Sequence, residues 1–272
     1  MNELEDLEIQ LLLEGIYRYY GFDFRNYAIA SLKRRILQVV QSENLLSIVG
    51  LLDKVLHDPV CMERFLLGIT LNPTAMFRDP EFYIAFREQI VPLLRTYPFV
   101  RIWHVGCSTG EEVYSMAILL HEAGLYNRCR IYATDMNEVV LRQAKAGVFS
   151  LSLMKEYAQL YLKAGGQASL TDYYTTTQDS AILKPFLKEN LVFSTHNLVT
   201  DASFNEFTVI FCHNVLIYFN QWLQDRVHKL LYESLRIFGI LSLGRHESLA
   251  NTPHEQEYEV LDTQIKLYRR MI

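Results

Sequence analysis

Residues 1–71 carry hydrophobic positions at helical spacing and almost no strand pattern. In the segment after Gly21, apolar residues recur every three or four positions, at Ile29, Leu32, Ile36 and Val39. This spacing predicts an amphipathic helix with one apolar face. Shorter apolar pieces continue the pattern as far as Ile69. We therefore expect a small all-helical N-terminal domain over residues 1–71.

The pattern changes from Val100 onward. Short runs of β-branched and aromatic residues alternate with stretches of helical periodicity, which is typical of a parallel sheet covered by helices on both faces. The expected strands are residues 100–105, 130–134, 191–194, 208–212 and 240–243. We expect residues 72–272 to form a doubly wound, mostly parallel, Rossmann-like α/β domain. The ligands of such sheets lie beyond the carboxyl ends of the strands.

Two segments interrupt the alternation. Residues 157–190 contain Gly165-Gly166 and a run rich in Thr and Tyr, which predicts a small β-rich insertion. Residues 259–270 include the alternating run Ile265-Lys-Leu-Tyr-Arg, which predicts a late strand added to an edge of the sheet. The α/β domain is therefore expected to carry two additions to its repeating pattern.

Composition narrows the class of protein. The 272 residues are 50% hydrophobic and 21% charged, which excludes a disordered or fibrous chain. The formal net charge of −5 argues against nucleic acid or an anionic membrane surface as a partner of the whole protein. The N-terminus is acidic and no stretch approaches the roughly 18 apolar residues of a membrane span, so we expect a cytoplasmic protein without membrane insertion.

The cysteines give no sign of a metal site or a disulfide framework. The chain has four of them, without CxxC spacing and without nearby paired histidines. We therefore expect reduced thiols and no bound metal.

A glycine-flanked turn follows the first predicted strand. Gly106 and Gly110 enclose the turn, which opens a helix, so the backbone there can approach a ligand closely. The turn matches neither the dinucleotide GxGxxG fingerprint nor a phosphate-binding P-loop, because Glu111 and Glu112 stand where the P-loop has Lys and Ser or Thr. Two acids would repel phosphate and suit a ligand with cationic groups. Alternatively, they only complement the helix dipole.

Two more segments deliver polar side chains to the ends of strands. Asp135 ends the second strand, where a carboxylate can accept two hydrogen bonds from the diol of a ribose. The alternative is that Asp135 caps the following helix. The strand at 208–212 is followed by His213, Asn214 and Tyr218, which are either site residues or helix caps, and we favour site residues.

Taken together, the motifs resemble the chemotaxis receptor methyltransferase family, CheR. The resemblance runs in order over about residues 20–250 and rests on LKRRI at 32–36, NPTAMFRD at 72–79, GCSTGEE at 106–112, ATD at 133–135 and CHNVLIYF at 212–219. It implies transfer of a methyl group from S-adenosylmethionine to glutamate side chains on the cytoplasmic helices of chemoreceptors. The products would be glutamyl methyl esters and S-adenosylhomocysteine. The oligomeric state is not predicted.

The resemblance also implies roles for individual residues. Besides Gly106 of the glycine turn, the implied cofactor contacts are Asn72, Thr74, Arg78, Glu112, Asp135, Asn197, Leu198, Asn214 and Val215. Arg78 and Tyr218 match the family positions nearest the reacting methyl group. We expect Arg78 to orient substrate and cofactor, and the Tyr218 hydroxyl to donate a hydrogen bond near the reacting centre. The alternative for Arg78 is an ion pair with Asp79 or Glu81.

A basic cluster in the helical domain suggests how a protein substrate is recognised. It comprises Arg25, Lys33, Arg34 and Arg35. The resemblance implies that this part of the chain faces the receptor, whose methylated helices are rich in glutamate, so charge attraction favours the encounter. The alternative is an ordinary solvated helix face.

Three positions depart from the family pattern. His213 replaces an arginine, which removes a permanent charge and substitutes one that titrates near neutrality. Met76 and Val113 read as packing changes.

Some family members use a β-subdomain near 157–190 to dock a receptor tail, but this segment resembles that pattern poorly, so tail binding is not predicted.

Two other function classes stay open on the sequence. One is a methyltransferase that acts on another protein or on a small molecule, against which the basic helix counts. The other is a catalytically weak regulatory or scaffold protein that binds S-adenosylmethionine, which only His213 supports. A nicotinamide oxidoreductase is disfavoured because GxGxxG is missing.

Overall fold

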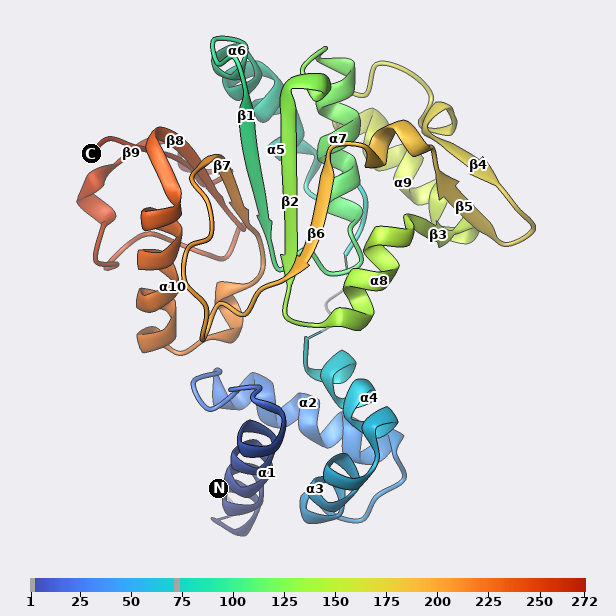
Figure 1. The fold of residues 1–272 in the computed structure, drawn as a ribbon, viewed down its shortest axis with the longest axis vertical. Helices are drawn as coiled ribbons and strands as arrows, with labels where there is room; N and C mark the ends of the chain where they lie inside the picture. The colour runs from blue at the N-terminus through green and yellow to red at the C-terminus, as the bar shows by residue number, and fades with distance from the viewer. Residues whose placement is uncertain (1–2, 71–73) are drawn as a thin grey trace. The chain divides into compact units, whose positions relative to one another are not determined.

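The computed structural model describes residues 3–70 and 74–272, which form two compact units (Figure 1). The helical unit comprises the described residues up to 70 together with Leu216–Val227. The α/β unit comprises the other described residues. The predicted domain boundary between residues 71 and 72 lies outside the described residues. No helix in the described ranges is both long enough and apolar enough to cross a membrane.

Four helices build most of the helical unit: α1 (Glu3–Tyr20), α2 (Ile29–Ser42), α3 (Ile48–His57) and α4 (Pro59–Thr70). The predicted stripe of α2 is buried at Leu32, Ile36 and Val39, whereas Ile29 opens the helix and is exposed. Gly68 lets α4 approach α2, because a Cβ at this position would lie 2.5 Å from Val39 Cγ2.

Residues far along the chain complete this unit. Tyr27 and Phe219 form an antiparallel bridge, and their rings lie 5.0 Å apart. The Ala28 amide donates to the Tyr218 carbonyl at 2.7 Å. The short 3-10 helix η5 (Leu216–Tyr218) therefore packs against the loop before α2.

A seven-stranded sheet runs through the α/β unit in the order β6-β2-β1-β7-β8-β10-β9 (Figure 1). Its strands are β1 (Val100–Val105), β2 (Cys129–Asp135), β6 (Leu191–Thr195), β7 (Phe207–Cys212), β8 (Leu235–Leu243), β9 (Tyr258–Asp262) and β10 (Leu267–Arg270). The first five in this order pair in parallel, and all five predicted strands are present. The predicted Rossmann-like, mostly parallel sheet is confirmed.

The C-terminal prediction of one late strand was wrong, because residues 258–270 form an antiparallel hairpin. Asp262 makes the turn: its Oδ1 accepts the amides of Gln264 at 2.8 Å and Ile265 at 3.1 Å. The chain therefore reverses, so that β10 pairs with β8 and β9 becomes the edge. A turn held by one side chain leaves little trace in a hydrophobic pattern.

Short and long helices precede β1 or connect the strands that follow it. They are α5 (Pro80–Ala85), the π-helix η1 (Phe86–Ile90), α6 (Val91–Leu94), α7 (Glu111–Glu122), η2 (Tyr126–Arg128), α8 (Glu138–Ala146), α9 (Leu151–Lys163), η3 (Leu170–Tyr173), η4 (Pro185–Lys188), α10 (Gln221–Ser234) and η6 (Glu255–Glu257). Every residue of α7 from Val113 to Leu120 is buried. The helix that follows the glycine turn is therefore fixed in the core.

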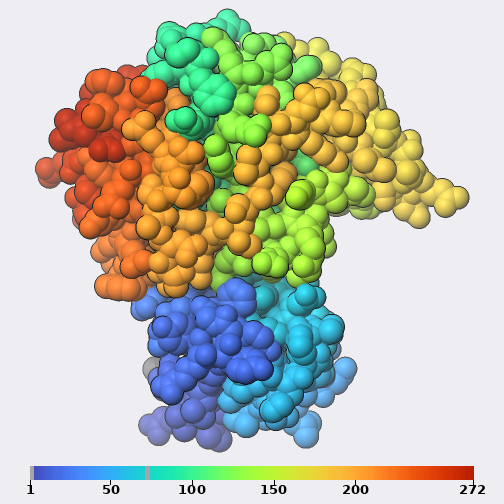
Figure 2. Space-filling view, in the orientation of Figure 1, coloured from blue at the N-terminus to red at the C-terminus, as the bar shows by residue number. Residues whose placement is uncertain are grey.

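A second, three-stranded antiparallel sheet has the order β3-β5-β4, with β3 (Val148–Ser150), β4 (Tyr174–Thr176) and β5 (Ser180–Leu183). Figure 2 shows the β4–β5 hairpin, in yellow, projecting from the α/β unit. The predicted insertion began at 157, but residues 157–163 lie in α9 and β3 precedes them. The Glu122 carboxylate anchors this region to α7, since it accepts the hydroxyls of Tyr161 and Tyr173 and pairs with Arg87.

Candidate active site

The carboxyl ends of four neighbouring parallel strands, β6, β2, β1 and β7, meet at one edge of the sheet. The structure brings together there the predicted site residues of the α/β unit that follow these strands, namely Gly106, Glu112, Asp135, Asn197, Leu198, Asn214 and Val215. Parallel strand order alone explains why segments so distant in sequence converge.

The turn after β1 requires its glycines. Gly106 and Gly110 have φ values of 63° and 93°, and Ser108 between them has 49°. A Cβ on Gly106 would lie 2.7 Å from Val215 Cγ2, which is closer than real Cβ atoms come. The turn thus packs directly against the segment that follows β7.

Asp135 ties the turn after β1 to the turn after β2. Its Oδ2 accepts the Ser108 amide and its Oδ1 accepts the Asn137 amide, both at 3.0 Å. The alternative that Asp135 caps the next helix is wrong, since Asn137 caps α8 by accepting the Val139 amide. Burial raises the pKa of Asp135, and the two amide donors offset part of that effect.

The segment after β6 continues this edge. Thr195 pairs with Asp135, and the His196 amide donates to the Asp135 carbonyl at 3.1 Å. Asn197 then turns the chain, because its Oδ1 accepts the Val199 amide at 3.0 Å. Leu198 is buried beside it.

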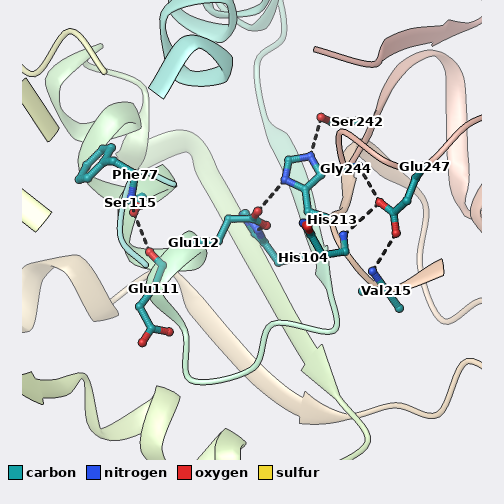
Figure 3. Close-up of polar contacts among 11 residues, drawn as sticks. Phe77, His104, Glu111, Glu112, Ser115, His213, Val215, Ser242, Gly244 and Glu247 are labelled. Atoms are coloured by element: carbon teal, nitrogen blue, oxygen red, sulfur yellow. Dashed lines mark hydrogen bonds and ion pairs between the residues drawn. The ribbon is translucent and has the colours of Figure 1, made fainter. Parts of the chain in front are cut away.

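Glu112 lies between two imidazole rings (Figure 3). Its Oε1 is 2.8 Å from His104 Nδ1, and its Oε2 is 2.6 Å from His213 Nδ1. His213 Nε2 in turn lies 2.7 Å from Ser242 Oγ. His104 Nε2 is buried and has no partner among the described residues, so the proton of a neutral ring belongs on Nδ1, facing Glu112.

The charges of this cluster reinforce one another. Burial would raise the pKa of Glu112, but the positive charge of His213 and the hydrogen bonds from both histidines hold it well below the ordinary value. Burial likewise lowers the pKa of His213, but the carboxylates of Glu112, Glu247 and Asp79 outweigh burial and raise it. Glu112 is therefore ionised, and its side chain stays 26% exposed.

Glu111 connects the turn to the loop that carries Arg78. Its carboxylate is buried and accepts the Thr109 hydroxyl at 2.6 Å. The Ser115 hydroxyl donates to the Glu111 carbonyl and accepts the Phe77 amide at 2.9 Å (Figure 3). The two acids thus do more than complement the helix dipole.

Arg78 sits between two strained residues. Phe77 and Asp79 have φ values of 54° and 55°, in the left-handed region. Such conformations cost on the order of 1–3 kcal/mol for residues other than glycine and concentrate at functional sites. Burial of Phe77 and the Ser115 contact hold the loop in this form, with Arg78 exposed. Thr74 is partly buried in the same loop, and Asn72 lies outside the described residues.

Glu247, a buried acid in the turn after β8, is a site residue that was not predicted from the sequence. Its Oε1 accepts the Val215 amide at 2.8 Å, and its Oε2 accepts the amides of Asn214 at 3.0 Å and Gly244 at 2.6 Å (Figure 3). Asn214 has a φ of 61°, so this carboxylate fixes an unusual backbone turn. The available signal was its position: an acidic residue in the short polar segment that follows the strand predicted at 240–243.

A cavity opens at this edge of the sheet. Its lining comes from the Arg78 loop, α5, α7, the end of β8 and the turns after β7, β8 and β9, and it combines charged, polar and apolar residues: Arg78, Asp79, Phe82, Glu112, His213, Asn214, Leu243, Gly244, Arg245, Gln264 and Ile265. Arg245 and Gln264 were not predicted from the sequence. In the described part of the chain, no cluster of side chains could hold a metal ion.

Comparison with known proteins decides the family. The all-alpha domain of CheR methyltransferases matches residues 7–70, and their S-adenosylmethionine-binding domain matches residues 72–266. The chain belongs to the CheR methyltransferase family. The resemblance seen in its motifs is thereby confirmed.

The chain is similar to several individual proteins. "Putative methyltransferase Cher3" of Pseudomonas putida is 46% identical over 97% of this chain and 97% of its own length. "Chemotaxis protein methyltransferase" of Listeria monocytogenes is 29% identical over 87% of this chain and 88% of its own. An uncharacterized 104.1 kDa protein of Rhodobacter capsulatus is 25% identical over 92% of this chain, which spans 26% of that protein.

S-adenosylmethionine is the cofactor of this CheR-family methyltransferase. The site fits it in two respects. Glu112 offers an ionised, partly exposed carboxylate, which suits a ligand with a sulfonium and an ammonium group. Gly106 keeps the backbone open where a side chain would collide with Val215. The roles predicted for the individual contact residues remain predictions.

The basic cluster of the methyltransferase is mostly engaged within the helical unit. Arg25 pairs with Asp23 at 2.8 Å and Glu14 at 3.2 Å. Lys33 pairs with Glu5 at 2.9 Å and Asp6 at 3.2 Å.

The other two members of the cluster differ from each other. Arg35 donates to the Ile69 carbonyl at 2.7 Å and lies over the Tyr218 ring. Arg34 is exposed and makes no ion pair with a described residue. Tyr218, like the whole cluster, belongs to the helical unit.

Proposed function

We propose that this methyltransferase transfers the methyl group of S-adenosylmethionine to glutamate carboxylates on the cytoplasmic helices of chemoreceptors, giving glutamyl methyl esters. The observation that carries the proposal is the charge pattern of the cavity. Its histidine and one of its carboxylates are tied to each other, while the guanidinium groups of Arg78 and Arg245 line the same space. A cavity with two guanidinium groups suits an acidic methyl acceptor. The name of the Listeria relative adds support.

The chemistry asks little of the protein beyond positioning. A glutamate side chain is ionised at neutral pH, so it is a nucleophile without a general base. The bound cofactor supplies a methyl group on a positively charged sulfur, which leaves as a neutral thioether. Arg78 then orients the acceptor carboxylate, and Glu112 holds the cationic end of the cofactor. Orientation of this kind supplies several kcal/mol in bimolecular reactions, up to about 7–11.

Residues 1–71 form the receptor-facing domain in this proposal, and residues 72–272 form the catalytic domain. Arg34 is the member of the basic cluster best placed to meet a glutamate-rich helix. The other three members, Arg25, Lys33 and Arg35, already bind acids or a carbonyl of the helical unit. The Tyr218 hydroxyl is proposed to donate a hydrogen bond near the reacting centre. Its backbone is held by the Ala28 amide.

A labelling experiment tests the proposal. The purified protein is incubated with methyl-labelled S-adenosylmethionine and membranes that contain chemoreceptors from its own source. We expect label on a receptor-sized band that mild base releases as methanol, because carboxyl esters are base-labile. Base-stable label would show methylation of another group, and label confined to small molecules would show another acceptor.

A further inference from the structure

Arg245 lies in a turn that is rigidly built. Glu247 accepts the Gly244 amide at 2.6 Å, and the Glu247 amide donates to the Gly244 carbonyl at 2.9 Å. A Cβ on Gly244 would lie 2.5 Å from Glu247 Oε2 and 2.8 Å from the Asn214 nitrogen. The backbone of this turn is therefore locked against the Asn214 turn, and Arg245 projects from it into the lining of the cavity.

The charge of Arg245 is only loosely held. Its side chain is 56% exposed, and its nearest acids are Asp79 at 3.9 Å and Glu81 at 3.4 Å, both exposed as well. Ion pairs of this kind contribute little, about 0–1 kcal/mol, because water screens them. Arg245 can therefore exchange these acids for the carboxylate of a ligand at small cost.

His213, by contrast, is fully engaged inside the protein. Its two ring nitrogens contact Glu112 and Ser242, and its side chain is 15% exposed. In this chain the positive charge at 213 is matched by Glu112, so the cavity's loosely held guanidinium on the β8 side comes from Arg245.

We propose that Arg245 binds the carboxylate of the methyl acceptor and makes the enzyme specific for anionic acceptors. The guanidinium presents a planar fork of N–H donors that matches a carboxylate. The inference rests on the proposed function, since it requires an acidic acceptor.

Kinetics of the whole protein test the role of Arg245. In R245A, we expect the KM for receptor methylation to rise about tenfold, the effect of losing one charge-assisted hydrogen bond. The Kd for S-adenosylhomocysteine, measured by calorimetry, should change less than about twofold, because Arg245 is assigned to the acceptor. R101A is the matched control: it removes an exposed arginine near the amino end of β1, and both constants should stay at the wild-type values.

A second substitution tests whether a guanidinium group elsewhere in the cavity lining can replace that of Arg245. H213R introduced into R245A should recover a large part of the lost KM effect, provided that S-adenosylhomocysteine still binds the double variant. An unchanged KM in R245A would overturn the proposal. So would a rise in KM matched by an equal loss of S-adenosylhomocysteine affinity, or a failure of H213R to rescue a double variant that binds it. If the wild-type protein yields no base-labile label on receptors, the proposed function itself fails, whatever R245A does.

Discussion

Glu112 is held from two strands at once, by His104 of β1 and by His213 directly after β7. This makes the stability of the site depend on pH. The raised pKa of His213 means that its stabilising contribution is complete below the ordinary histidine pKa of about 6.5 and is lost as pH rises through the folded-state value. The lowered pKa of Glu112 means that its contribution is lost only in acid, below about pH 4.

We expect H213Q to reveal this dependence. Glutamine keeps hydrogen-bonding capacity but carries no charge, so the wild-type protein should be more stable than H213Q by about 1–3 kcal/mol at pH 6. The gap should shrink as pH rises above the ordinary histidine pKa of about 6.5, because the unfolded chain then gives up this proton more readily than the folded protein. Urea unfolding at several pH values measures it. H246Q, at an exposed histidine, is the control, and a gap that stays constant from pH 6 to 9 would refute the assignment.

Substitutions at two glycines with similar backbone angles can distinguish the effect of backbone strain from that of a steric collision. Gly106 and Gly124 have φ values of 63° and 69°, but only Gly106 has a neighbour that a Cβ would strike. G106A and G124A should each lose about 1 kcal/mol of stability through the left-handed backbone. G106A alone should weaken binding of S-adenosylhomocysteine, by at least about tenfold, because Val215 must move. Equal affinities in the two variants, measured by calorimetry, would show that the Gly106–Val215 contact does not shape the site.

At the scale of elements, helix α2 shows that neighbouring basic side chains can differ in how far they are engaged within the protein. Lys33 faces the acids of α1, and Arg35 reaches α4 through the Ile69 carbonyl. Both side chains hold helices together. Arg34 lies between them in sequence and points to solvent. Fewer of these positive charges are therefore available to a receptor helix than the basic run suggests.

R34E should slow receptor methylation without disturbing the cofactor site. We expect the KM for receptor to rise about threefold to tenfold at low ionic strength, since charge reversal opposes a glutamate-rich surface. The effect should diminish at about 0.5 M salt. Methylation rates against receptor concentration at both salt levels measure it, with S-adenosylhomocysteine affinity and thermal stability as readouts that should not move. R101E supplies the same change of charge elsewhere, and an equal effect of R101E would argue for nonspecific repulsion.

For the molecule as a whole, chain order and spatial units do not coincide. Leu216–Val227 lies in sequence between the site turns after β7 and β8, yet it belongs with the first helices, through Tyr27, Ala28 and Phe219. The formal net charge of −5 does not show where the individual charges lie. Acids and bases pair within each unit, as between Arg25 and Glu14 or Arg87 and Glu122, so the few loosely held arginines such as Arg34 and Arg245 matter more than the total.

The sequence by itself determined the architecture and the family. Alternating strand and helix patterns predicted five strands at their observed places. This works because a parallel strand that is buried on both faces needs a continuous run of apolar residues, which can be recognised without knowing its neighbours. It also placed Gly106, Asp135 and Asn214 at strand ends, where parallel order makes them converge.

Only the tertiary structure decided which side chains meet. Glu112 binds histidines from two different strands, and Glu247 accepts three amides from the turns after β7 and β8. Arg245 likewise lines a cavity together with residues from other strands. The reversal at Asp262, which turned one predicted strand into the β9–β10 hairpin, belongs with them. Contacts of this kind depend on loop geometry and strand order, and the hydrophobic pattern of a single segment carries no record of the groups that it will face across the sheet edge.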